Sequence, residues 1–319
     1  MILFNKVLFD WINSSGLSRS DFIAKLQMFD YENFSGLDAI TLSRWINGKT
    51  TPPIYKQILI GKCLNIDLVE FIISIDVSQL KCSSKLSRVV SNFVKVLDYV
   101  QPIFSYKKSR QQIKVYYDEL DFQTFDMYFG EFYKNIDPLN KFISGLYELG
   151  NGLVYPAIRV LNENDEVVGH WVSVESLESL NGKYSFVSLT KKELKESCLI
   201  NVCFFNNSKH YFELVVNAIC NYLLMLKYNE KRFVYFFVSG YSTYEITKHA
   251  FGSEDVRYYP PKNKFTNLGV YLVKVDIIKS IANPILLPLV QEKLKCLKSC
   301  DSNCNRCNLK KYYQHLAEV

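Results

Sequence analysis

The sequence predicts an all-α N-terminal domain followed by an α/β domain with a mixed sheet. Over the first 75 residues, apolar side chains recur three and four positions apart, which is typical of amphipathic helices. From residue 111 onward, alternating apolar runs are interleaved with helical patterns, which is typical of a sheet covered by helices. A chain of 319 residues has room for about two such domains.

The composition predicts a well-packed cytoplasmic protein. Hydrophobic residues make up 48% of the chain and aromatic residues 15%, which is enough to build a core. The start of the chain lacks a secretory signal pattern, and the apolar runs are too short to span a bilayer, so no membrane partner is expected. The nine cysteines should therefore be reduced, buried or metal-bound. A formal net charge of +6 permits a polyanionic partner without requiring one.

Five helices are expected in the N-terminal domain, two before and two after a central helix. The first covers residues 4–12, and the second covers residues 20–27, with Ser18 as its N-cap. Two more cover residues 55–63 and 68–75.

The helix between these pairs carries a start signal and a stop signal. Asp38 is suited to cap its first turn, and Gly48 tolerates the left-handed backbone that ends many helices. Leu42, Trp45 and Ile46 share one face at helical spacing. The remaining side chains are mostly small, polar or basic, which suits close approach to base edges and phosphates. The alternative is an amphipathic surface helix without a partner.

Residues 43–49 read Ser-Arg-Trp-Ile-Asn-Gly-Lys, and Pro52 and Pro53 follow. This run resembles the recognition helix of the Cro/C1-type (XRE) helix-turn-helix regulator family, and the resemblance covers roughly the first quarter of the chain. It implies a transcription regulator that binds double-stranded DNA as a homodimer, with this helix in the major groove. The connection over residues 28–35 is longer than is usual in the family. The residues expected to contact DNA are Ser18, Ala39, Ile40, Thr41, Ser43, Arg44, Asn47 and Lys49.

Charge in this part of the chain is unevenly placed. Residues 1–75 carry seven basic and seven acidic side chains, so their own electrostatic affinity for DNA should be modest. Residues 81–114 carry eight basic side chains against a single acid, Asp98, and predict an amphipathic linker helix. Two interpretations remain open for this helix. It forms a dimer contact with a basic face toward DNA, or it packs on the second domain with its lysines in solvent.

Residues 111–290 predict, in order, a strand, two helices, four strands, a helix, a strand, a helix and two strands. This order is similar to the GNAT acyltransferase fold, in which a three-strand meander follows the first two helices. A turn at Asn162–Asp165 predicts a hairpin between the first two of the four strands. The expected strands cover 113–117, 155–161, 167–174, 184–189, 199–205, 232–238, 255–259 and 270–275, and the expected helices cover 122–133, 138–149, 210–226 and 243–250.

The GNAT resemblance implies that backbone N–H groups at a glycine-containing strand-to-helix turn hold the pyrophosphate of acyl-CoA. The equivalent turn, residues 206–210, contains no glycine, although Ser208 and Lys209 could receive an anion. Tyr241 and Tyr244 lie near the place of the family's general acid. We expect no catalytic residue, and a domain that senses a small-molecule or acyl ligand or mediates dimerisation. The alternatives are a DNA-associated N-acyltransferase, or an antitoxin or phage-control interaction factor.

Two further features of the sequence bear on chemistry. His170 lies within a predicted strand, where a structural histidine is expected rather than a catalytic one. The spacing Cys296-x3-Cys300-x3-Cys304-x2-Cys307 provides four thiols within twelve residues. These thiols predict a zinc site, with an iron–sulfur cluster or no metal as alternatives.

The predicted domain divisions are a helix-turn-helix domain over 1–76, a basic linker helix over 77–110, a GNAT-like domain over 111–290 and a cysteine-rich tail over 291–319.

Overall fold

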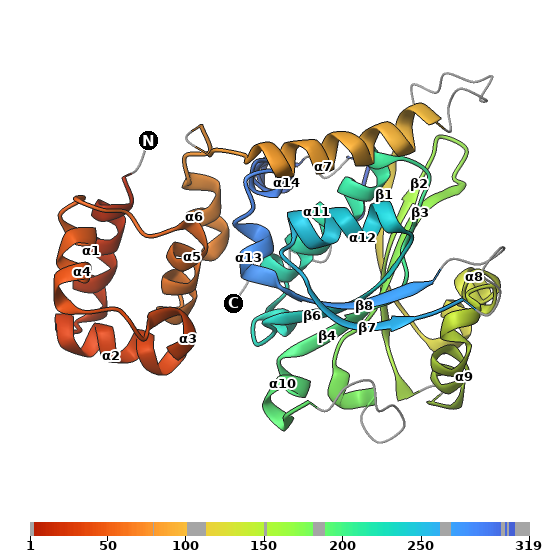
Figure 1. The fold of residues 1–319 in the computed structure, drawn as a ribbon, viewed down its shortest axis with the longest axis horizontal. Coiled ribbons are helices and arrows are strands. Elements are labelled where there is room, and N and C mark those ends of the chain that lie inside the picture. Colours follow the sequence, from red (N-terminus) through yellow and green to blue (C-terminus); the bar gives the residue numbers. More distant parts are fainter. Residues whose placement is uncertain are drawn as a thin grey trace. The chain divides into compact units, whose positions relative to one another are not determined.

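The computed structural model describes residues 3–78, 80–100, 113–149, 152–180, 189–261, 269–300, 304 and 306–309. Its contacts divide the chain into two compact units, which are described separately below (Figure 1). The N-terminal unit comprises residues 1–81 together with 281–295. The C-terminal unit comprises residues 82–280 together with 296–319.

The N-terminal unit is built from helices. They are α1 (Phe4–Ser15), α2 (Arg19–Phe29), α3 (Tyr31–Phe34), α4 (Ala39–Ile46), α5 (Ile54–Cys63), α6 (Leu68–Ser74) and most of α14 (Leu286–Ser299). The five helices expected from residues 4–75 are all present. The sequence did not predict α3, a single turn that Asp30 caps by accepting a hydrogen bond from the Asn33 N–H. This turn lies within the long connection between α2 and α4.

The core of this unit consists of one buried stripe from each main helix. Gln291 ties α14 to these helices, because its side-chain amide donates to the carbonyls of Ile72 at 2.7 Å and Ile75 at 2.8 Å. Trp11 and Phe71 pack edge to face with ring centroids 4.9 Å apart. The fully buried side chains include Leu8, Phe22, Leu26, Leu42, Ile58, Ile60 and Ile72.

The C-terminal unit is organised around a mixed sheet with the order β1-β2-β3-β4-β6-β8-β7. The pair β4–β6 is parallel and the neighbouring pairs are antiparallel, while β5 pairs with β3. The strands are β1 (Lys114–Leu120), β2 (Tyr155–Leu161), β3 (Val167–Val174), β4 (Ser197–Ile200), β5 (Phe204–Phe205), β6 (Phe233–Ser239), β7 (Glu254–Tyr259) and β8 (Val270–Asp276).

The described strands follow the expected chain order, with one break. The strand expected over 199–205 is interrupted at residues 201–203, which separate β4 from β5. The strand expected over 184–189 lies outside the described residues, apart from its last position. An N-terminal helical region followed by a mixed sheet with helices is consistent with a GNAT-like α/β arrangement.

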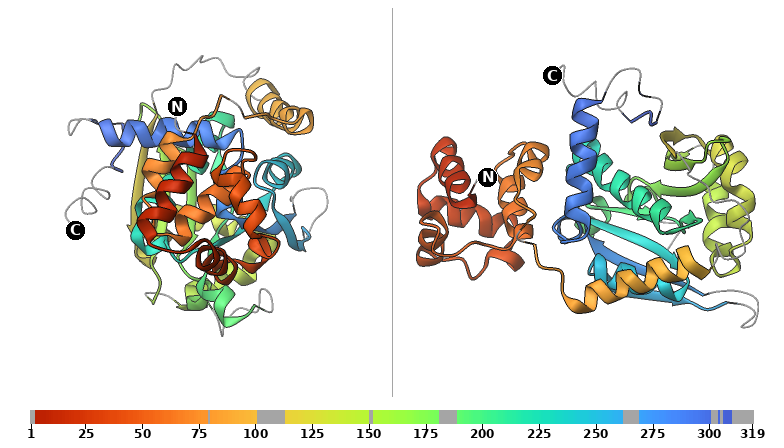
Figure 2. Two further views of the ribbon diagram at one scale, coloured as in Figure 1. Left: turned by 90° about the vertical axis from the view of Figure 1, so that its left-hand side faces the viewer. Right: turned by 90° about the horizontal axis from the view of Figure 1, so that it is seen from above.

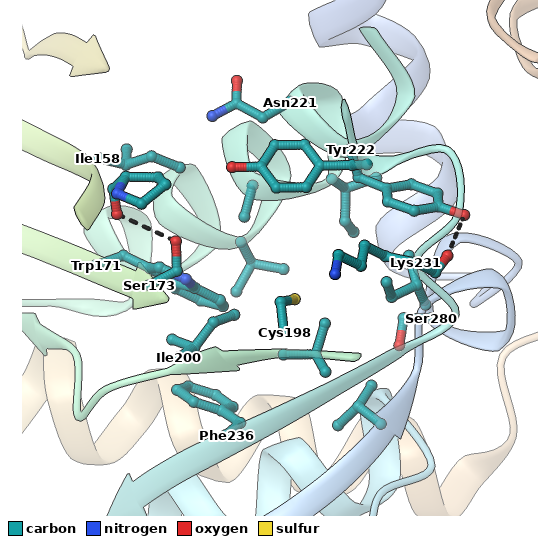
Figure 3. A pocket seen from close by; sticks show the side chains of 18 of the residues that line it. Ile158, Trp171, Ser173, Cys198, Ile200, Asn221, Tyr222, Lys231, Phe236 and Ser280 are labelled. Carbon is teal, nitrogen blue, oxygen red and sulfur yellow. Dashed lines mark hydrogen bonds between the residues drawn. The ribbon is translucent and has the colours of Figure 1, made fainter. Parts of the chain in front are cut away.

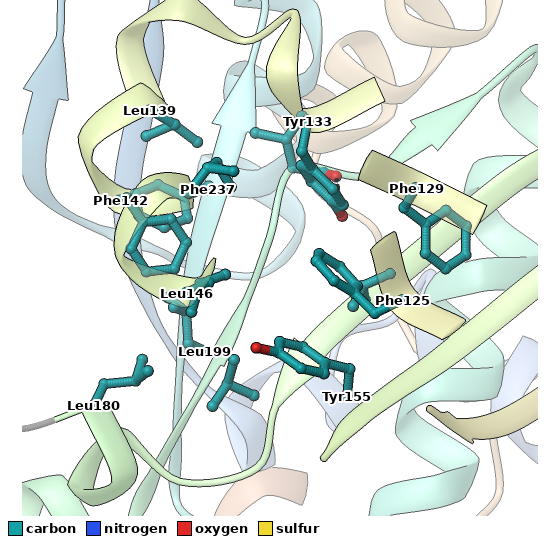
Figure 4. Packing of buried hydrophobic residues seen from close by; sticks show 14 of the residues in the cluster. Phe125, Phe129, Tyr133, Leu139, Phe142, Leu146, Tyr155, Leu180, Leu199 and Phe237 are labelled. Atoms are coloured by element: carbon teal, nitrogen blue, oxygen red, sulfur yellow. Dashed lines mark hydrogen bonds between the residues drawn. The ribbon is translucent and has the colours of Figure 1, made fainter. Parts of the chain in front are cut away.

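Helices cover both faces of the sheet (Figures 1 and 2). The helices of this unit are α7 (Ser84–Lys95), η1 (Val96–Val100), α8 (Phe122–Lys134), η3 (Asp137–Leu139), α9 (Asn140–Leu149), η5 (Leu177–Leu180), α10 (Lys191–Lys195), α11 (Ser208–Leu224), η6 (Leu226–Tyr228), α12 (Tyr241–Ala250) and α13 (Ile277–Ile281). One face of the sheet carries α8 and α9 and holds a core in which Phe125 stacks on Tyr155 with ring centroids 4.4 Å apart (Figure 4). The other face carries α11 and α12.

Helix α7 packs on α12 of its own unit. Leu86 and Phe93 are buried on its inner face, whereas Lys85, Arg88 and Lys95 are exposed. This packing corresponds to the second of the two interpretations given above for the basic helix.

None of the described helices has the length and apolar character needed to cross a lipid bilayer.

Candidate nucleic-acid interface and ligand cavity

Helix α4 begins and ends at the residues that the sequence indicates. The Asp38 carboxylate accepts a hydrogen bond from the Thr41 backbone N–H at 2.6 Å, and this bond lowers the pKa of the Asp38 carboxyl. Gly48 adopts a φ of 68°, a left-handed backbone conformation that residues with a Cβ rarely adopt. The two signals are local, which is why the helix could be delimited from sequence.

The two sides of α4 differ sharply in exposure. Leu42 is 0% exposed and Trp45 is 7% exposed, whereas Ile40 on the outer side is 64% exposed. Thr41 and Ser43 are half-buried beside this outer face. The predicted contact residues that are exposed on or just after α4 are Ala39, Ile40, Arg44, Asn47 and Lys49. Side chains that differ in size and hydrogen-bonding capacity therefore point away from the core.

Two cations flank the end of α4. Neither the Arg44 guanidinium nor the Lys49 ammonium forms an ion pair with another residue in the described part of the chain. The backbone holds the two residues close, because the Arg44 carbonyl accepts a hydrogen bond from the Lys49 N–H at 2.9 Å. Both charges are thus available to an external anion.

Ser18 occupies the cap of α2, as predicted, but its hydroxyl is already engaged. The oxygen accepts a hydrogen bond from the Asp21 N–H at 3.2 Å and donates one to the Asp21 carboxylate at 2.6 Å. A carboxylate beside this hydroxyl repels a phosphate. The geometry therefore favours the α4 residues over Ser18 as contacts for a polyanion.

Of the residues considered for catalysis, Tyr244 and His170 are held by other contacts within the unit. The Tyr244 hydroxyl donates to the Asp255 carboxylate at 2.8 Å and accepts from Lys248 at 2.7 Å, while Tyr241 is largely exposed. His170 is 3% exposed and is packed against the ring of Phe129 at 4.5 Å. Burial lowers the pKa of His170 to about 3, and its Nε2 finds no hydrogen-bond partner among the described residues. A neutral, enclosed imidazole of this kind is unsuited to proton transfer with a substrate.

A cavity lies within the C-terminal unit, between α11 and the sheet (Figure 3). Its volume is about 110 Å³, and its walls are mostly apolar, including Ile158, Trp171 and Phe236. Lys231 reaches its wall, where the ammonium donates to the Lys195 carbonyl at 2.7 Å and burial lowers the pKa of Lys231. Burial also raises the pKa of the lining Cys198 thiol to about 12, so this thiol is protonated and unreactive near neutral pH.

Sequence reasoning missed this cavity. The available signal was the spacing of Val215, Ala218, Ile219 and Tyr222, which identifies the inward face of α11. Periodicity shows that a face is buried, but it does not show whether the space beneath that face is filled.

The cysteine-rich tail is partly described. Residues 306–309 lie along β1, where the Asn308 side chain donates to the Tyr117 carbonyl and accepts from the Tyr117 N–H, both at 2.8 Å. Burial and a hydrogen bond with Cys304 raise the pKa of Cys300, so these two thiols are close together. Among the described residues, no three His, Cys, Asp or Glu side chains are grouped in a way that would hold a metal ion.

Comparisons with known proteins give little further information. No protein-family model matches the chain, and no curated protein matches it. Among solved structures, the chain is weakly similar to the N-terminal domain of ribosomal-protein-alanine acetyltransferase from Clostridium acetobutylicum ATCC 824. The identity is 12%, the TM-score is 0.25, and the match covers 39% of this chain and 85% of that one. A TM-score this low does not define a common fold, so the α/β assignment depends on the strand order itself. No comparison supports membership of the XRE family.

Proposed function

We propose that this chain is a transcription regulator that binds double-stranded DNA in a sequence-specific manner through its N-terminal helices. Helix α4 would enter the major groove, and the C-terminal unit would sense a ligand or mediate dimerisation. The observation that carries this proposal is the two-sided character of α4. Its inner residues are in the core, while Ala39, Ile40, Thr41 and Arg44 lie on the side left for base edges.

The second support is the state of the cations at the end of α4. Base contacts from α4 would be combined with phosphate contacts from Lys49, which forms no ion pair in the described part of the chain. The N-terminal unit has ten basic and nine acidic side chains, so its overall field attracts DNA weakly. Binding as a homodimer to two half-sites about one helical turn apart would double the number of contacts.

The experiment is selection of a preferred duplex from a random library by the full-length protein, followed by titration with variants. We expect Arg44→Ala to weaken binding to the selected duplex by about tenfold to a hundredfold, because a bidentate base contact contributes roughly 1–3 kcal/mol. Lys6→Ala removes an exposed positive charge from α1 of the same unit and should change affinity less than about twofold. Unchanged affinity of Arg44→Ala for the selected duplex would exclude α4 as the reading element.

For the C-terminal unit we propose that the cavity binds a small, mainly apolar ligand. Its volume of about 110 Å³ is of the order of apolar protein cavities, about 150 Å³, that accept benzene. Thermal-shift titration with small aromatic and short-chain acyl compounds should raise the melting temperature. Ala218→Leu, which adds side-chain volume to the cavity wall, should remove the shift. Failure of every compound to change melting or DNA affinity would assign the unit a purely structural role.

We also propose that Cys296, Cys300, Cys304 and Cys307 bind zinc, which requires these thiols to move together from their described positions, where no three of them are grouped. Thiolates are strong zinc ligands, and Cys296 and Cys300 are one helical turn apart in sequence. Metal analysis of freshly purified protein should find close to one equivalent of zinc, and a chelator should release it. Less than about a tenth of an equivalent of zinc and iron together would rule out a metal site in the tail.

A further inference from the structure

The cavity beneath α11 has one charged side chain among its described lining residues, Lys231. This residue is 6% exposed, so its ammonium is largely removed from water. In Figure 3 the Lys231 ammonium points toward the Cys198 thiol, into a space whose other walls are mostly apolar. A ligand in this cavity would therefore meet a cation on one side and hydrocarbon on the others.

The backbone around Lys231 fixes the position of this cation. The Lys231 N–H donates to the Tyr228 carbonyl at 2.9 Å, and the Lys231 carbonyl accepts from the Tyr222 hydroxyl at 3.1 Å. The ammonium donates to the Lys195 carbonyl at 2.7 Å and to the Ser197 carbonyl at 3.4 Å. The second bond is long, and both acceptors are neutral. Because an ammonium binds a carboxylate more strongly than a carbonyl, a carboxylate can replace the long bond.

Two serine hydroxyls on the cavity wall are directed toward the protein backbone. Ser173 donates to the Pro156 carbonyl at 3.1 Å, and Ser280 donates to the Asp276 carbonyl at 3.0 Å. Each hydroxyl proton is thus already used within the protein. The Lys231 ammonium is better suited than these hydroxyls to orient a ligand.

A buried ammonium favours an anionic ligand over a neutral one for an energetic reason. The desolvation of the ammonium is present with and without the ligand, so binding an anion adds only the desolvation of the anion. The attraction between the two charges is strong in a site that excludes water. A neutral ligand makes no comparable interaction with the ammonium.

Two acids also act on the Lys231 charge, but each is paired with another lysine. Glu175 lies 3.5 Å from the Lys227 ammonium. Glu230 lies 2.9 Å from the Lys195 ammonium. These ion pairs reduce the repulsion that the two acids would exert on an anion in the cavity.

We propose that the cavity binds a small monocarboxylate with an apolar tail, whose carboxylate accepts a hydrogen bond from the Lys231 ammonium while the tail packs against the apolar wall. This inference rests on the proposal that the cavity binds a ligand, and it adds the charge of the ligand and the residue that holds it. The lining residues of α11 lie between Val215 and Tyr222. The site is therefore distinct from the turn at residues 206–210 that the GNAT resemblance implies.

The test compares butyrate with butyramide, which has the same number of non-hydrogen atoms but no charge. Butyrate also has as many non-hydrogen atoms as benzene, which apolar protein cavities accept. Calorimetry with the full-length protein should show that butyrate binds about tenfold more tightly than butyramide. Lys231→Met keeps a side chain of similar length without the charge, so it should abolish this preference and still bind butyramide. Lys191→Met, which removes an exposed cation of α10, should behave like the unmodified protein.

Equal affinity of the unmodified protein for the two compounds would overturn this inference and leave the cavity as a site for neutral ligands. Binding of neither compound would also overturn it, and the ligand site itself would fall only if the aromatic compounds failed as well. A preference for butyrate that persists in Lys231→Met would place the acid elsewhere on the protein. If Lys231→Met does not fold, Ala218→Leu supplies the second test, because filling the cavity should remove butyrate binding. Retained butyrate binding in that variant would contradict the proposal.

Discussion

The two units of this protein use their charged side chains differently. In the C-terminal unit, several cations are paired with acids of the same unit, as where Arg159 lies 2.7 Å from Asp118 and Lys227 contacts Glu119 at 2.5 Å. In the N-terminal unit, Arg44 at the end of α4 forms no ion pair with any residue that the structure describes. A cation that is already paired with an acid of its own unit is less available to bind a partner. Arg44 is therefore the better placed cation for contact with a partner, despite the nearly neutral charge of its unit.

The starts of two helices show a similarity between the units. A carboxylate of the same unit binds each of them, Asp98 at α11 and Asp38 at α4. The units differ instead near the end of α4, where Arg44 has no ion-pair partner among the described residues.

The largest expected effect concerns the inner side of α4. Leu42→Ala should lower the free energy of unfolding of the N-terminal helices by about 2–5 kcal/mol, because it opens a cavity at a fully buried position. Ile40→Ala, on the outer side of the same helix, should have little effect on stability. Hydrogen exchange of residues 4–74 measures both variants. Similar losses of protection would mean that α4 does not have distinct inner and outer sides.

The next effect concerns the buried imidazole of the C-terminal unit. The pKa of His170 is about 3 in the folded protein and about 6.5 in an unfolded chain, so the unfolded chain binds more protons between these values. Stability should therefore fall as the pH is lowered, by about 2 kcal/mol between pH 7 and pH 5 from this residue alone.

Urea denaturation at the two pH values checks this expectation. His170→Leu should show a smaller dependence on pH than the unmodified protein. An equal dependence in the two proteins would mean that His170 is hydrated, or hydrogen-bonded in its charged form.

The smallest effect concerns the outer cations. Lys49→Ala should weaken DNA binding almost equally for all sequences and lower the slope of log affinity against log salt by about 1, because one phosphate contact is lost. Lys141→Ala, an exposed position on α9 of the other unit, should leave the slope unchanged. Equal slopes for the two variants would remove the proposed difference between the units.

The sequence predicted the elements near α4 well because their signals are local. Asp38 and Gly48 act within a few residues of the helix that they delimit, and the spacing of Leu42 and Trp45 identifies its buried face. The four-residue α3 escaped prediction because one turn is too short to show a helical period.

Predictions in the C-terminal unit matched the order of most described strands and long helices. The apolar runs did not reveal the short helices α10 and α13, and they did not show that residues 201–203 interrupt a strand. The cavity lined by Trp171 and Phe236 was also missed, because several distant elements form its wall.

By itself, therefore, the sequence determined where most of the described helices and strands lie and which face of α4 is left outside the core. Caps and periodicity encode these features over a few residues. Only the tertiary structure decided that Asp98 binds the start of α11, and that Gln291 joins its helix to the N-terminal unit through Ile72. These contacts join residues more than a hundred positions apart, and no local pattern in the chain specifies such a pairing.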